Sequence, residues 1–137
     1  MRDDLALTAA ALWWGGLTAV GFGAVPLLFL HLPSAALAGQ TAAHLFSALN
    51  VMAVLCGLVL LAIFRTNRPL GQSEYAVATH FLIVGGMLLA LLLELGVAPR
   101  IVARQDLRLW HSVGTALYAV QWLCALAVLR RSARRGT

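Results

Sequence analysis

The chain has 137 residues, of which 61% are hydrophobic and only 11% charged, which leaves too little polar surface for a water-soluble domain. The net charge of +5 comes from ten arginines and no lysine. These arginines flank apolar segments, where they orient membrane proteins and meet anionic head groups. We therefore expect a lipid bilayer as the partner and no nucleic acid.

The first two apolar segments cover about residues 5–30 and 42–64, close to the roughly 20 helical residues that cross a bilayer. The segment Met1-Arg2-Asp3-Asp4 is not a basic signal region, so we expect the first span to be retained. Pro26 predicts a kink near its outer end, and Pro33 a break after it. The polar residues 65–69 end the second span.

The third and fourth spans are expected at about residues 75–96 and 109–129, with Ser73 as the N-cap of the third and Pro99 as its end. Arginines at every fourth position from 100 to 108 predict an interfacial turn or helical extension whose basic stripe faces head groups. The sequence thus predicts one all-α domain, an integral membrane four-helix bundle.

The orientation follows from the arginines. With four spans, the termini and the loop between the second and third spans share one side, which carries Arg2, Arg65, Arg68, Arg130, Arg131, Arg134 and Arg135. The other side has only Arg100, Arg104 and Arg108. Because an excess of arginine marks the cytoplasmic face, we predict cytoplasmic termini, in a bacterial inner membrane.

Small residues indicate how the helices meet. Gly15, Ala19 and Gly23 repeat every four residues on the first span and predict a strip for close helix packing, or for a homo-oligomer. Ala53 with Gly57 repeats this pattern on the second span, and Gly85-Gly86 in the middle of the third span suggests either close packing or a bend. Cys56 and Cys124 lie inside apolar runs, where packing is a more common role for cysteine than ligation.

Ionisable groups are costly in a bilayer and indicate function by default. His80, Met87 and Glu94 are seven residues apart, so we expect them on one helix face. His44 and His111 fall near the outer boundary with Glu94 and could converge with it. The candidate metal ligands are therefore His44, His80, Met87, Glu94 and His111. Imidazole and thioether suit copper, and carboxylate with imidazole suits several other metal ions.

Other interpretations stay open. Glu94 could form an interfacial ion pair with Arg100 or Arg104, and the histidines could be hydrogen-bonded within the bundle. Polar residues that follow His44 and His111 inward, namely Ser47, Asn50, Thr115, Tyr118 and Gln121, could line a wet cavity or bond helices together. A haem between His44 and His111 would lie unusually close to water. No nucleophile with its base, phosphate loop or dinucleotide fingerprint is present, so we expect no enzymatic activity.

Several short motifs resemble a known family: residues 12–16 (LWWGG), 25–29 (VPLLF), 97–101 (VAPRI) and 110–112 (WHS). Together they resemble the bacterial four-helix domain of unknown function numbered four-one-four-nine. That family is similar to transmembrane proteins associated with platinum-drug resistance, and distantly to copper-resistance membrane domains of the D type. Where the family often has leucine and asparagine, this chain has Trp110 and Tyr118.

Two functional hypotheses follow. The first is a membrane protein that binds or transports a small solute, such as a metal ion, through the interior of its bundle. The second is a structural or interaction module of a membrane complex.

Overall fold

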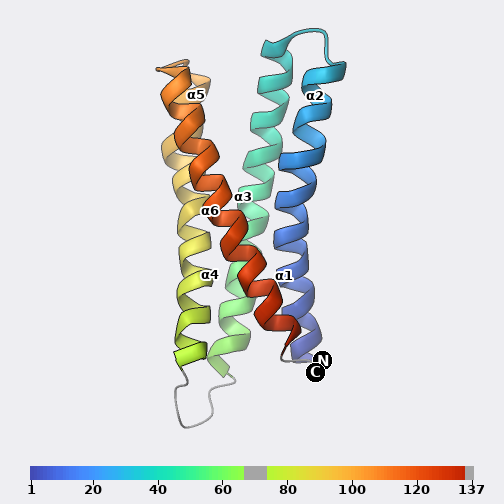
Figure 1. Ribbon diagram of the computed structural model, residues 1–137, viewed down its shortest axis with the longest axis vertical. Coiled ribbons are helices and arrows are strands. Elements are labelled where there is room, and N and C mark those ends of the chain that lie inside the picture. The colour runs from blue at the N-terminus through green and yellow to red at the C-terminus, as the bar shows by residue number, and fades with distance from the viewer. Residues whose placement is uncertain (67–73, 135–137) are drawn as a thin grey trace.

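Four long helices form one bundle in the computed structural model, which describes residues 1–66 and 74–134 (Figure 1). The first and the third of these four long helices each continue without a break through a short π-helical stretch. In chain order the elements are α1 (Arg2–Thr18), η1 (Ala19–Ala24), α2 (Val25–His31), α3 (Ala35–Thr66), α4 (Glu74–Leu92), η2 (Leu93–Val97), α5 (Ala98–Val102) and α6 (Leu107–Ala133). The all-α four-helix fold is confirmed.

Each of the four helices is long and apolar enough to cross a membrane. Their lengths are 30, 31, 27 and 27 residues, which at about 1.5 Å per residue exceeds a hydrocarbon core of about 30 Å. The chain is therefore a multi-pass membrane protein whose helices reach into the head-group layers. The expected N-cap at Ser73 lies outside the described residues, as do Arg68, Pro69, Gly71 and Arg135.

The helices run alternately up and down, with both chain ends, the end of α3 and the start of α4 at the same end of the bundle (Figure 1). Both α1 and α4 pack against α3 and against α6. The helices α3 and α6 consequently face each other diagonally across the core. The four helices thus form a square bundle around one shared interior.

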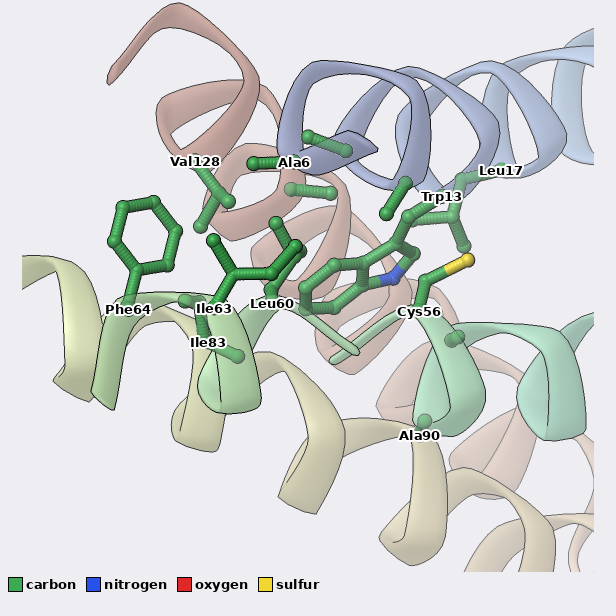
Figure 2. Close-up of a cluster of buried hydrophobic side chains, with 14 of the residues drawn as sticks. Ala6, Trp13, Leu17, Cys56, Leu60, Ile63, Phe64, Ile83, Ala90 and Val128 are labelled. Carbon is green, nitrogen blue, oxygen red and sulfur yellow. The ribbon is translucent and has the colours of Figure 1, made fainter. Parts of the chain in front are cut away.

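The core is apolar and centred on the indole of Trp13, whose side chain is fully buried. Figure 2 shows Trp13 reaching from α1 toward Cys56 of α3 and the Ala90 region of α4. Leu17, Leu60 and other buried side chains continue this cluster along the bundle. Many outward side chains are also apolar, as expected for surfaces that face lipid rather than water.

Two prolines sit inside continuous helices because π-helical turns accommodate them. Proline lacks the N–H that would bond the carbonyl four residues earlier, and its ring crowds that carbonyl. Widened turns lie directly before Pro26 and before Pro99, at η1 and η2. The expectation that Pro99 would end the helix was wrong, since α5 carries the helix on to Val102.

The η1 turn has a second cause, the hydroxyl group of Tyr118 on α6. This hydroxyl donates to the Leu17 carbonyl at 2.6 Å and also bonds to the backbone of Gly21. Leu17 and Gly21 are four residues apart, so Tyr118 occupies the place of a normal helical hydrogen bond. A side chain inserted in this way widens or bends a helix. The contact ties α6 to the first span.

The glycines that pack inside the bundle are not those of the expected strip. Gly15 and Gly23 face open space, so the strip formed with Ala19 lies on the outer surface and not between helices of this chain. The close approaches are made instead by Gly21 against Tyr118 and by Gly86 against Trp13. Gly57, by contrast, packs closely against Met87 as expected from its small size.

The arginine segment divides between two helices and a turn. Arg100 lies on α5, where its guanidinium donates to the Gly96 carbonyl and lies 4.6 Å above the ring of Trp110. Arg104 is in the turn with a φ of 56°, and Asp106 caps α6 by accepting from the Leu109 backbone N–H. Both expected forms, a turn and a helical extension, are therefore present.

We predict that Gly21→Ala destabilises the protein, whereas Gly23→Ala does not. A methyl group at position 21 would meet the Tyr118 hydroxyl at 2.7 Å, while a methyl at position 23 meets nothing within 4 Å. Overpacking of this kind costs about 1–3 kcal/mol. Thermal unfolding in detergent should show a lower melting temperature for Gly21→Ala alone. Equal effects of the two substitutions would contradict the insertion of Tyr118.

Candidate functional site

Glu94 is bound inside the bundle by two polar residues of α3. The Ser47 hydroxyl donates to one carboxylate oxygen at 2.8 Å, and the Asn50 amide donates to the other at 3.0 Å. Asn50 is buried, and Glu94 is half-buried. An acidic side chain at this depth requires such donors, because burying an unpaired charge is very costly.

The backbone at Glu94 belongs to the π-helical turn η2. At the end of this turn the Ala98 N–H donates to the Leu93 carbonyl, and Pro99 has no N–H to donate. Turns of this type occur frequently at functional sites. Glu94 thus lies in the widened turn η2, between α4 and α5.

A cavity of about 180 Å³ lies beside the carboxylate, between α3 and the third helix. Asn50 and Glu94 are among its seven lining residues, together with the apolar side chains of Val51, Val54, Leu55, Ala90 and Leu91, and the surface within it is apolar. Val51 and Leu55 are more than half exposed on the outside of the bundle. The cavity therefore opens sideways, toward lipid.

The expected shared face of His80, Met87 and Glu94 is confirmed, because each of them meets α3. The ring of His80 lies edge-on to Phe64 with centroids 6.3 Å apart, Met87 packs on Gly57, and Glu94 bonds to Asn50. The third helix thus advances by seven residues from one of these contacts to the next, while its antiparallel neighbour α3 goes back by seven, from Phe64 to Gly57 to Asn50.

This spacing keeps the three groups apart. Two helical turns separate neighbouring members by about 11 Å, far beyond the 2–3 Å of a metal–ligand bond. The Nδ1–H of His80 instead donates within its own helix, to the Ala76 carbonyl oxygen at 2.8 Å. The three side chains form a row along one seam, and the structure does not gather them around one ion.

The other two candidate ligands, His44 and His111, are exposed on the outside of the bundle. His111 lines an open groove of about 480 Å³ that consists of α6 residues alone. Within residues 1–66 and 74–134, no three side chains of the types His, Cys, Asp and Glu are placed to hold a metal ion. The expected convergence of His44, Glu94 and His111 does not occur.

The ion pair considered for Glu94 is also absent, since the partners of its two oxygens are Ser47 and Asn50. Arg100 stacks on Trp110 instead. From the sequence, Ser47 and Asn50 were expected only as polar residues that follow His44 toward the middle of the membrane. Their pairing with Glu94 could have been found from helical phase, because antiparallel neighbours that match Gly57 with Met87 also match position 50 with position 94.

Comparison with known proteins identifies a family that covers most of the chain. The family described as "Domain of unknown function (DUF4149)" matches residues 8–109. The chain belongs to this family. The part matched to DUF4149 contains Ser47, Asn50 and Glu94 and reaches into the start of α6. A search of curated proteins found no match, and a search of solved structures found none.

We predict a measurable coupling between Asn50 and Glu94. In a double-mutant cycle with Asn50→Leu and Glu94→Met, the unfolding free energy in detergent should reveal a coupling of about 0.6–1.7 kcal/mol, the range found for hydrogen bonds between membrane helices. Leu58→Ala, which removes a lipid-facing side chain of α3, provides the matched control. Its coupling to Glu94→Met should be near zero. Equal coupling in both cycles would argue against the hydrogen bond.

Proposed function

We propose that this membrane protein binds a small cationic solute at Glu94. The observation that carries the proposal is an acidic side chain held by Ser47 and Asn50 between two membrane helices, beside a cavity that Glu94 helps to line. Ionisable side chains in membrane spans mark ligand and ion pathways more often than structure alone. A cation is the solute that such a charge would attract.

The donor set favours some cations over others. The polar groups gathered here are the Glu94 carboxylate, the Ser47 hydroxyl and the Asn50 amide, and oxygen ligands of this kind suit hard metal ions better than copper. The cysteine nearest this part of the seam in sequence, Cys56, is a buried free thiol outside the cavity wall. Copper, one of the expected metals, is therefore a weaker candidate at this site than calcium or sodium.

The shape of the cavity also admits an organic cation. Five of its seven lining residues are apolar, and Glu94 is one of the other two. A cavity of about 150 Å³ with apolar walls accommodates a molecule the size of benzene. An alkylammonium ion could place its ammonium group at Glu94 and its chain against Val54 and Leu91. Metal ions and alkylammonium ions share the positive charge that Glu94 would recognise.

We predict that a cation stabilises the purified protein through Glu94. A ligand at 100 times its dissociation constant stabilises the native state by about 2.7 kcal/mol. Calcium chloride, sodium chloride and n-butylammonium chloride should be compared at equal ionic strength by thermal unfolding. At least one of them should raise the melting temperature of the wild type and of Glu74→Gln. Glu94→Gln, which keeps the shape but removes the charge, should not respond.

The control and the alternative follow from the same experiment. Glu74 lies at the opposite end of the bundle and is exposed, so its substitution removes one negative charge without touching the cavity. If none of the salts stabilises the wild type, or if Glu94→Gln responds equally, the proposal is overturned. The second candidate, an interaction module, would then gain support from the outward strip of Gly15, Ala19 and Gly23.

We further propose a bacterial inner-membrane location with cytoplasmic termini. The end of the bundle with both termini carries Arg2, Arg65, Arg130, Arg131 and Arg134 among the described residues, against three arginines at the other end. Short arginine-rich segments remain on the cytoplasmic side.

We predict that a green fluorescent protein fused after Thr137 is fluorescent in a bacterial host, whereas alkaline phosphatase at the same position is inactive. The first reporter folds in the cytoplasm and the second in the periplasm. Insertion of each reporter into the turn after Val102 should give the opposite pattern. An active phosphatase at the C-terminus would reverse the proposed orientation.

A further inference from the structure

Gln121 is a fully buried polar side chain with unused hydrogen-bonding capacity. Its relative exposure is 0%, and neither its amide nitrogen nor its carbonyl oxygen has a hydrogen-bond partner among the residues that the structure describes. It belongs to the buried face of α6 with Ala125 and Val128. Leaving such groups unpaired in a core costs about 1–3 kcal/mol, so nearly all buried polar groups have a partner.

Gln121 and Asn50 both lie near the middle of their helices, α6 (Leu107–Ala133) and α3 (Ala35–Thr66). The rings of Phe46 and Tyr118 meet across the bundle with centroids 5.4 Å apart, and α3 and α6 run in the same direction from this contact (Figure 1). Asn50 follows Phe46 by four residues and Gln121 follows Tyr118 by three.

The two carboxamides therefore both belong to the middle part of the interior, on diagonally opposed helices. Asn50 is buried and bonded to Glu94, whereas Gln121 is buried and unpaired. Trp13 contributes a further donor, because its indole N–H is also buried without a partner in the described part of the chain. Trp13 packs on Gly86 beside Cys124, one helical turn beyond Gln121.

We propose that Gln121 binds water in the centre of the bundle, so that the polar interior extends from Glu94 to α6. Water both donates and accepts, which matches the free N–H and C=O groups of one carboxamide. Buried water of this kind typically makes about three hydrogen bonds. The indole N–H groups of Trp13 and Trp14 on α1, both buried without a partner in the described part of the chain, are the candidates to supply another. The central site is thus a hydration site and separate from the cation at Glu94.

The test uses the full chain in lipid nanodiscs with ¹⁵N-labelled glutamine. Magnetisation exchange between water and the side-chain amide protons reports whether water contacts Gln121. Its signal is identified by its loss in Gln121→Met, and the exposed Gln40 serves as the positive control. We expect a water cross-peak for Gln121. The backbone N–H of Ala125, one turn away and fully buried, should show none in a uniformly labelled sample.

The opposite result is equally clear. A Gln121 signal without a water cross-peak, together with side-chain protons that persist for hours in D₂O, would overturn the proposal. Gln121→Leu provides a second measurement, because in a dry core it removes an unpaired amide and should raise the melting temperature. Repeating the exchange measurement on Glu94→Gln separates the two proposals. The Gln121 cross-peak should persist there even though the response to cations is lost.

Discussion

The hydrogen bonds from α3 to Glu94 are the interaction on which the interior of this protein depends. An acidic side chain in a span that is otherwise apolar must be supplied with donors from a neighbouring helix, and Ser47 and Asn50 supply them. The register between α3 and the third helix then follows, with Met87 on Gly57 and His80 beside Phe64. The same register leaves a cavity beside Asn50 and Glu94.

Local departures from regular helix serve this arrangement. At η2 the missing N–H of Pro99 is accommodated by a widened turn that contains Glu94, whose carboxylate bonds to α3. At η1 the widened turn accommodates Pro26 and the inserted hydroxyl of Tyr118. Both turns lie in the half of the bundle away from the termini (Figure 1). That half is therefore less regular than the other.

The sequence was sufficient to predict four membrane helices and the common face of His80, Met87 and Glu94, because hydrophobic length and helical phase determine both. It did not reveal that the helix would continue past Pro99, since the widened turn that allows this depends on contacts with other helices. Nor did it place His44 and His111 outside the bundle, because rotation of a helix about its axis is decided by packing. For the same reason the strip of Gly15 and Gly23 proved to face outward.

The most direct test of this account is the side-chain carboxyl resonance of Glu94 in protein labelled with ¹³C-glutamate and embedded in lipid. The chain contains only two glutamates, Glu74 and Glu94, so the signals are readily assigned. Removal of the amide donor by Asn50→Leu should move the Glu94 resonance, whereas Leu58→Ala on the lipid-facing side of α3 should leave it in place. A Glu94 resonance that is the same in both variants would contradict a carboxylate held by α3.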